Sequence, residues 1–308
     1  MVGNSLPRPW VRGTPLAGDA SSRCYARVWD AAGRTAILVR YPQPVRGRLG
    51  RDLEVRSWFE RHGLRVPALI ESHRGEGWAV LEDLGEADAE AALEQAAARD
   101  REALAARSLE PLVALARIAP AQLPHWNPPL AADRLRWELT GFELWFVRHR
   151  CGRRPGPELG RWLDGLAEEI AGHPQRICHR DYHLNNLFLL PGGEVGLIDT
   201  QDVLVGPDTY DAASLLNERA MPDLLGREVR LRLEERWAEA TGAAGGWRQR
   251  MRLVALQRAL KVLGTFAALE AGGRAGYGRW LEQLALQLPG ELESAAAPPG
   301  LVALLLDL

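Results

Sequence analysis

A short polar segment, HRDYHLNNLF at residues 179–188, stands between two apolar stretches of the chain. Within it Asp181 precedes Asn186 by five residues, and Asp199 follows thirteen residues later, after the apolar run VGLI. A loop that carries Asp181 and Asn186, followed by a hairpin that ends at Asp199, would return three oxygen-bearing side chains to one end of a small sheet. Oxygen ligands of this kind suit Mg²⁺ and leave room for water and phosphate. The spacing therefore predicts a magnesium site with one carboxylate left to orient a hydroxyl group.

The first 85 or so residues have the pattern of a sheet with one helix. Residues 25–41, YARVWDAAGRTAILVRY, are typical of two strands around the turn AAGR. Residues 50–64, GRDLEVRSWFERHGL, have helical apolar spacing, and Gly63 is suited to end that helix. Residues 66–86, VPALIESHRGEGWAVLEDLGE, return to strand character. The expected order is a hairpin, a helix and further strands.

The rest of the chain is expected to be mainly helical. The exceptions are RICHRD at residues 176–181 and NLFLLPGGEVGLIDTQD at 186–202, which together read as a small hairpin with polar ends. A final short helix is expected after residue 300. Helical apolar spacing between Pro and Gly interruptions predicts helices near residues 87–118, 130–150, 157–172, 209–219, 224–240, 246–271 and 275–288.

Composition narrows the class of protein. A chain of 308 residues with 46% hydrophobic content can fold around a sizeable core. The net charge of −2 gives no reason to expect nucleic acid or an anionic membrane as a partner, so a small ligand is expected. Three widely spaced cysteines, Cys24, Cys151 and Cys178, form no disulfide or metal pattern, and no apolar window is long enough to span a membrane. These features predict a cytoplasmic protein.

The polar segment matches a known motif. The pattern H-x-D-x-x-x-x-N from His179 to Asn186, with LIDTQD at residues 197–202, resembles the catalytic and metal-binding segments of the protein-kinase-like superfamily, in particular its aminoglycoside phosphotransferase and choline kinase branch. Further stretches look like segments of the cell-wall-recycling kinases that phosphorylate N-acetylmuramate and N-acetylglucosamine at the anomeric hydroxyl. These are DASSRCYARV, AVLEDLG, QDVLVGPDTYDAASLL and QRALKVLGTFAAL.

The resemblance implies an α+β, two-lobe protein-kinase-like fold. A small β-rich nucleotide-binding lobe would comprise residues 1–85, and a larger helical lobe with the catalytic loop and substrate site would comprise residues 86–308. Asp181 would orient the attacking hydroxyl, while Asn186 and Asp199 would hold Mg²⁺ against the phosphates of ATP.

Nucleotide binding is expected to depart from the protein-kinase pattern. Adenine would lie against residues 81–85, which include Glu82 and Leu84. The usual strand lysine is missing, because the only lysine, Lys261, lies far along the chain. Arg40 is therefore the nearest candidate cation, with Glu54 or Glu60 as its partner.

The glycine-rich loop is also degenerate. In LAGDASSRCY, the side chains of Ser21, Ser22 and Arg23 would have to cover the phosphates together with backbone amides. No GxxxxGK[ST] motif is present anywhere, which excludes the Walker-type NTPases.

Several polar residues are candidates for the acceptor site. His183, Gln201, Asp202 and Glu218 could contact substrate, although each could equally be a solvated polar residue. Lys261 could likewise contact sugar or phosphate, or lie on a solvated helix face.

Two further residues are expected to support the catalytic loop. His179 is expected to brace it by hydrogen bonds. Asp211 could reach back to the loop, as the resemblance implies, or act with Asp208 at the start of a local helix; a mixed role is favoured.

The function expected from the resemblance is ATP- and Mg²⁺-dependent phosphorylation of the anomeric hydroxyl of N-acetylmuramate or N-acetylglucosamine. Glucosamine or another hexose, an aminoglycoside and choline stay open as acceptors. A catalytically inactive nucleotide-binding or scaffolding module is an alternative of another class, which the missing lysine permits. The intact Asp181, Asn186 and Asp199 argue against that alternative. The oligomeric state is left open.

Overall fold

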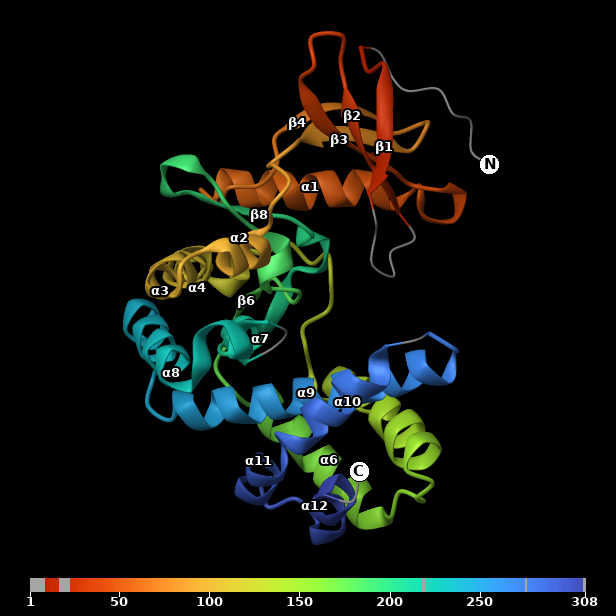
Figure 1. Ribbon diagram of the computed structural model, residues 1–308, viewed down its shortest axis with the longest axis vertical. Coiled ribbons are helices and arrows are strands. Elements are labelled where there is room, and N and C mark those ends of the chain that lie inside the picture. Colours follow the sequence, from red (N-terminus) through yellow and green to blue (C-terminus); the bar gives the residue numbers. More distant parts are fainter. Residues whose placement is uncertain (1–8, 17–22, 218–219, 275, 307–308) are drawn as a thin grey trace. The chain divides into compact units, whose positions relative to one another are not determined.

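The chain forms two compact units. Figure 1 labels many of their helices and strands. The computed structural model describes residues 9–16, 23–217, 220–274 and 276–306. Unit 1 comprises Met1–Ala114 and Leu184–Val203, and unit 2 comprises Leu115–His183 and Leu204–Leu308. Each unit therefore takes two stretches of chain. These units group residues by their contacts and do not define the lobes of a kinase. The lobe boundary expected at residue 85 therefore stays a prediction.

Unit 1 is built on a five-stranded antiparallel sheet in the order β1-β2-β3-β5-β4. The predicted hairpin is confirmed as β2 and β3, in which Cys24 pairs with Arg40 and Trp29 with Thr35. Edge strand β1 was not predicted, because its sequence RGTPL is exposed and contains Gly and Pro. The strands are β1 Arg12–Leu16, β2 Cys24–Trp29, β3 Thr35–Arg40, β4 Leu69–His73 and β5 Trp78–Glu82.

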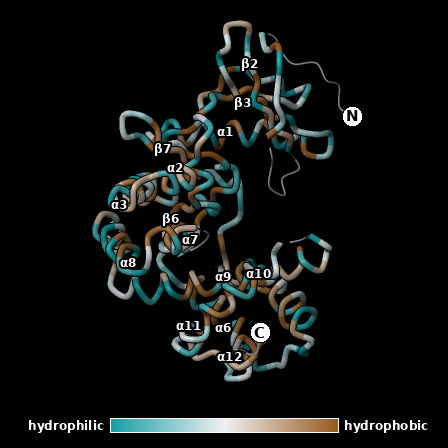
Figure 2. Tube along the Cα trace, viewed as in Figure 1, coloured by the Kyte–Doolittle hydropathy of each residue, from teal (hydrophilic) through white to brown (hydrophobic). Residues whose placement is uncertain are grey.

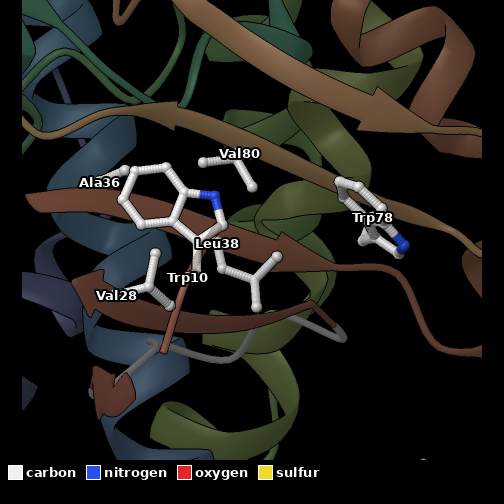
Figure 3. Packing of buried hydrophobic residues seen from close by; sticks show 6 residues of the cluster. All are labelled: Trp10, Val28, Ala36, Leu38, Trp78 and Val80. Atoms are coloured by element: carbon white, nitrogen blue, oxygen red, sulfur yellow. The ribbon is translucent and has the colours of Figure 1, made fainter. Parts of the chain in front are cut away.

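Alternation along the strands gives the sheet two apolar faces. Leu38 belongs to a cluster on one face, whose side chains are drawn in Figure 3, and Val39 belongs to a cluster on the other. Helix α1 (Arg48–Arg61) contributes Leu49 to the second cluster, so it covers that face. The first cluster consists of Trp10, Val28, Ala36, Leu38, Trp78 and Val80.

The second stretch of unit 1 is a small hairpin of β7 (Leu187–Leu189) and β8 (Val195–Leu197), as the sequence predicts. Gly192 and Gly193 have φ of 83° and 99°, which a residue with a Cβ adopts only with strain, so these glycines permit the tight turn. The remaining elements are α2 Ala89–Gln95, α3 Ala98–Arg107, α4 Glu110–Ala116, which continues into unit 2, and the 3-10 turns Gln43–Val45, Leu184–Asn186, Pro191–Gly193 and Thr200–Asp202.

Unit 2 is mainly helical around one two-stranded antiparallel ladder. Strand β6 (Gln175–Cys178) pairs with β9 (Leu204–Pro207), so RICHRD belongs to a ladder separate from the β7–β8 hairpin. The helices are α5 Ala132–Glu138, a π-helix Phe142–Arg150, α6 Pro157–Ala171, α7 Tyr210–Asn217, α8 Met221–Thr241, α9 Trp247–Ala271, α10 Tyr277–Leu286, α11 Pro289–Ser294 and α12 Pro299–Leu306, with a 3-10 turn at Pro120–Gln122.

The predicted helices are present, but two long ones are divided, and the one near 224–240 is kinked at Gly226. The stretch near 87–118 divides into α2, α3 and α4, and the stretch near 130–150 divides into α5 and the π-helix. Figure 2 shows hydrophilic and hydrophobic residues alternating along helices such as α6, whose buried side chains recur at helical spacing. Within the described ranges, no helix is both long and apolar enough to cross a membrane.

Helix α9 crosses the segment before the π-helix at very close range. A Cβ added to Gly264 would lie 2.4 Å from the backbone nitrogen of Phe142 and 2.5 Å from the carbonyl carbon of Gly141. Only glycine fits there, because the obstructing atoms are backbone and cannot rotate away. This contact fixes α9 against the chain that follows α5.

Candidate active site

The turn that carries Asp181 follows β6 in unit 2 and is held by Asp211. The carboxylate of Asp211 accepts hydrogen bonds from the main-chain nitrogens of His179 at 2.6 Å and Arg180 at 2.9 Å. Asp211 is buried in the first turn of α7, and burial raises its pKa. These are the contacts that the reach-back interpretation of Asp211 requires. The carboxylate of neighbouring Asp208 instead binds Arg250 at 2.8 and 3.1 Å.

The histidines of the motif lie inside unit 2. His179 is fully buried, and its ring meets that of Tyr182 edge to face with centroids 5.6 Å apart. The bracing of the loop by hydrogen bonds from His179 stays a prediction. His183 is also buried, so the reading of His183 as a solvated loop residue is wrong, and its contact with substrate stays a prediction.

Asn186 and Asp199 come together at one end of the β7–β8 hairpin in unit 1. Leu187 pairs with Leu197, and just beyond this pair the backbone nitrogen of Ile198 donates to the carbonyl of Asn186 at 3.0 Å. Asp199 has φ 60° and ψ 40°, a left-handed conformation that is uncommon for a residue with a Cβ. The hairpin therefore places both predicted metal ligands at the same end. Asp181 belongs to unit 2, so its convergence with them stays a prediction.

The donor chemistry of this pair fits Mg²⁺. The side chain of Asp199 is 35% exposed, which leaves its carboxylate accessible from water, and Asn186 adds an amide oxygen. Among the described residues there is no group of three or more His, Cys, Asp or Glu that could hold a metal. A site of one carboxylate, one amide and water molecules does not need such a group, because Mg²⁺ commonly keeps several waters.

Arg23 lies beside Asp199 and connects it to the sheet. One guanidinium nitrogen of Arg23 donates to Asp199 at 3.0 Å, and the other donates to Gln201 at 3.0 Å and lies 3.6 Å from Asp52. Burial alone would lower the pKa of Arg23, but the electrostatic effects of Tyr25 and Asp199 outweigh it, so this pKa is raised. The guanidinium is therefore a permanent positive charge next to a predicted metal ligand.

Asp52 and Tyr41 complete this cluster, and the sequence interpretation missed both. The hydroxyl of Tyr41 donates to Asp52 at 3.0 Å. Burial raises the pKa of Asp52, while Tyr41 and Arg23 oppose that rise. Asp52 stands three and four residues before the buried Val55 and Arg56 on α1, so helical spacing could have placed it on the inner face.

The expected pairing of Arg40 is only partly addressed by the structure. Arg40 is the last residue of β3, and Glu54 is exposed on α1. Glu60 is held by Arg56 at 2.9 and 3.0 Å. The structure thus places Asp52, which the sequence interpretation did not consider, beside Arg23, the residue before β2. A bond between Arg40 and Glu54 stays a prediction. Ser21 and Ser22 lie outside the described residues.

The segment expected to meet adenine is held within unit 1 by side chains. Asp83 binds Arg27 through two hydrogen bonds of 2.6 and 3.0 Å, and Glu82 binds Arg65 through both oxygens. Arg65 lowers the pKa of Glu82. A Cβ on Gly196 would come within 2.7 Å of Leu84, so Leu84 packs directly on β8. Adenine binding by this segment stays a prediction.

The acceptor candidates in unit 1 contact one another. The amide nitrogen of Gln201 donates to Asp199 at 3.0 Å and to Asp202 at 3.1 Å. Both residues therefore belong to the cluster around Asp199, and their contact with substrate stays a prediction. Glu218 lies outside the described residues.

The Phosphotransferase enzyme family model matches residues 12–254. The chain belongs to this family. It is 29% identical over 267 residues to a Pseudomonas aeruginosa protein named N-acetylmuramate/N-acetylglucosamine kinase, covering 83% of this chain and 76% of that protein. A Neisseria meningitidis protein of the same name is 29% identical over 271 residues, covering 83% and 78% of the two chains.

Solved structures show the same fold. Choline kinase LicA from Streptococcus pneumoniae aligns with a TM-score of 0.63 at 14% identity, covering 92% of this chain and 94% of that chain. An aminoglycoside-3'-phosphotransferase of type VIII aligns with a TM-score of 0.56 at 19% identity, covering 81% and 92%. The predicted α+β kinase-like fold, with a small antiparallel sheet and a mainly helical remainder, is confirmed.

Proposed function

We propose that this protein is an ATP-dependent kinase for the anomeric hydroxyl of N-acetylmuramate, N-acetylglucosamine or both. The observation that carries the proposal is similarity along 83% of the chain to two proteins named as kinases of these sugars. The family match supports phosphoryl transfer to a hydroxyl group. The cytoplasmic location expected from the sequence fits this use of ATP and belongs to the same proposal.

Asp181 is assigned to the acceptor hydroxyl. The hydroxyl oxygen forms a bond to the γ-phosphorus of ATP while the bond from that phosphorus to the bridging oxygen breaks, giving a sugar 1-phosphate and ADP. The hydroxyl proton passes to Asp181 and then to water. An anomeric hydroxyl is more acidic than an ordinary alcohol, so Asp181 chiefly orients it.

The nucleotide side is assigned to unit 1. Asn186 and Asp199 are the residues that would hold Mg²⁺, which when bound neutralises negative charge on the phosphates. Arg23 is assigned to the phosphates in place of Arg40, because its guanidinium already lies 3.0 Å from Asp199. Its planar fork suits phosphate oxygens. Asp52 lies 3.6 Å from this arginine, and Tyr41 donates a hydrogen bond to Asp52.

The test is turnover of purified protein with ATP and Mg²⁺ against N-acetylmuramate, N-acetylglucosamine, glucosamine, other hexoses, an aminoglycoside and choline. ADP release gives the rate, and phosphorus NMR of the product identifies a sugar 1-phosphate. We expect Asp181→Asn to lower kcat about 1,000-fold, because it removes the group that accepts the proton. Asp164→Asn is the matched control, since Asp164 is exposed on α6 and pairs with Arg136.

Three results would count against the proposal. Preferred turnover of choline or an aminoglycoside would replace the acceptor. Binding of ATP without turnover of any acceptor would favour the inactive nucleotide-binding module. Equal rates for the wild type and Asp181→Asn would remove the role of Asp181.

A further inference from the structure

Glu138, the last residue of α5, is a buried carboxylate shared by two cations from distant parts of the chain. Its side chain is 2% exposed. One oxygen lies 2.7 Å from a guanidinium nitrogen of Arg180 and 3.3 Å from the ammonium of Lys261. The other accepts a 3.4 Å hydrogen bond from Gln257. The sequence interpretation missed Glu138, because nothing in its local sequence distinguishes it from a solvated helix residue.

The charges of this cluster depend on one another. Burial alone would raise the pKa of Glu138, but Lys261 and Arg180 outweigh it, so this pKa is lowered and the carboxylate is ionised at neutral pH. Burial lowers the pKa of Lys261, while Glu138 and Asp181 oppose that decrease. Lys261 thus lies within electrostatic reach of the assigned catalytic carboxylate. It is the single lysine of the chain, and its side chain is 31% exposed while its ammonium contacts Glu138, so both readings of Lys261 from the sequence stay predictions.

Arg180 has an uncommon backbone conformation and is held at three points. Its φ is 80°, in the left-handed region that a residue with a Cβ adopts only with strain. Asp211 accepts from its main-chain nitrogen, Arg258 donates to its carbonyl at 3.4 Å, and Glu138 binds its guanidinium. Asp181 follows in the chain, so the conformation of Arg180 sets the direction in which the Asp181 backbone leaves the turn.

Arg258 is itself fixed inside unit 2. Its guanidinium donates to the hydroxyl of Ser214 at 2.9 Å and lies 4.5 Å from the ring centroid of Tyr210. Main-chain support from Arg258 and Asp211 therefore comes from rigid helices. Glu138 binds the guanidinium of Arg180 through its side chain, and this support comes from a third helix.

We infer that Glu138 is a positioning residue for phosphoryl transfer: through Arg180 it holds the turn that presents Asp181 to the acceptor hydroxyl. The inference rests on the proposed function in taking Asp181 as the group that orients the acceptor. Because Glu138 is buried and acts through Arg180, its removal should affect the chemical step more than it affects affinity.

The experiment compares Glu138→Gln with Glu143→Gln, five residues further along and also paired with an arginine, Arg136. We expect Glu138→Gln to lower kcat about 30-fold with less than about twofold change in either KM, because a misplaced group loses orientation and not binding. Glu143→Gln is expected to retain the wild-type kcat. Glu138→Asp keeps the charge on a shorter side chain and is expected to recover part of the lost rate.

A double variant separates positioning from general stability. Glu138→Gln leaves excess positive charge in a buried place, and adding Lys261→Met removes one of those charges. We expect the double variant to regain Tm while kcat stays low. A crystal structure of Glu138→Gln is expected to show Arg180 with negative φ, whereas the wild type keeps it positive.

The outcomes distinguish the two claims. Wild-type kcat in Glu138→Gln, or recovery of kcat together with Tm in the double variant, would overturn the positioning role. Unchanged φ of Arg180 in the crystal structure would overturn it independently of any assay. A wild-type protein that phosphorylates no acceptor, with Arg180 shifted in the variant, would reject the proposed function and retain the structural role of Glu138.

Discussion

The two units organise charge in opposite ways. In unit 1 one cation, Arg23, is shared by carboxylates, and the carboxylate of Asp199 that it contacts is 35% exposed. In unit 2 one carboxylate, Glu138, is shared by the cations of Arg180 and Lys261, and it is 2% exposed. The first, hereafter the open cluster, has a partly exposed carboxylate in Asp199, whereas the second, hereafter the closed cluster, has a buried carboxylate in Glu138 beside a Lys261 that is 31% exposed.

The exposure of the two carboxylates decides whether each can leave its arginine for another ligand. An exposed carboxylate can leave an arginine for a metal ion or solvent at little cost, because water replaces the lost contact. A buried carboxylate cannot, because the cations left behind would be desolvated and unpaired. The difference agrees with the proposed roles, in which Asp199 exchanges Arg23 for a ligand and the turn that carries Asp181 is held in place.

The largest effect on stability is expected at Gly264 of α9, the helix that also carries Lys261 of the closed cluster. Gly264→Ala should destabilise the protein by about 3 kcal/mol, because the new Cβ would overlap backbone atoms of Gly141 and Phe142. Thermal or urea denaturation measures this. Activity should fall as well, since α9 also carries Gln257, Arg258 and Lys261.

The control for this change has the opposite sign. Gly165 is an exposed residue inside α6, where a Cβ would meet nothing within 4 Å. Gly165→Ala should stabilise the protein by about 0.5–1 kcal/mol, because alanine loses less backbone entropy in a helix. Equal effects at Gly264 and Gly165 would show that the helix crossing is not tightly packed.

A smaller effect is expected at Arg23 in the open cluster, where a substitution should change the binding of ATP and not the stability of the fold. Arg23→Gln should raise the KM for ATP about 30-fold, corresponding to about 2 kcal/mol for a charged hydrogen-bonding group. Arg40→Gln should raise it less than about threefold, because Arg23 is the arginine assigned to the phosphates from its contact with Asp199. Steady-state kinetics with varied ATP measures both. The reverse order would return the phosphate role to Arg40.

The smallest effect is on the pH dependence of stability, and it concerns His173 in unit 2. His173 is buried just before β6, and its Nδ1 takes no hydrogen bond within the described ranges. Burial lowers its pKa below the usual 6.5, although Asp208 opposes this. Between pH 7 and 5 the unfolded chain therefore takes up a proton that the folded protein resists, and stability falls as the pH falls.

His173→Gln should remove about 0.5–1 kcal/mol of that loss, which denaturation curves at pH 7 and pH 5 would reveal. His125→Gln, at an exposed position, is the control and should leave the pH dependence unchanged. A wild-type pH dependence in His173→Gln would show that His173 is not the group responsible.

Local patterns in the sequence were sufficient for much of the fold. The β2–β3 hairpin, α1 and the β7–β8 hairpin were predicted, since alternation and glycine turns are properties of neighbouring residues. Strand β1 was missed because its place depends on pairing with β2, and β9 because it pairs with β6 across an intervening hairpin. The breaks inside the long helical stretches were missed for a similar reason, since tertiary packing outweighs helix propensity there.

The sequence by itself determined the motif, the family resemblance and the pair Asn186 and Asp199, because these depend on spacing within about twenty residues and on one hairpin turn. Only the tertiary structure decided that Arg23 meets Asp52, and that Lys261 meets Glu138. Charged side chains of the same kind look alike in a sequence. Burial and long-range packing determine which of them become partners, and those depend on residues far apart in the chain.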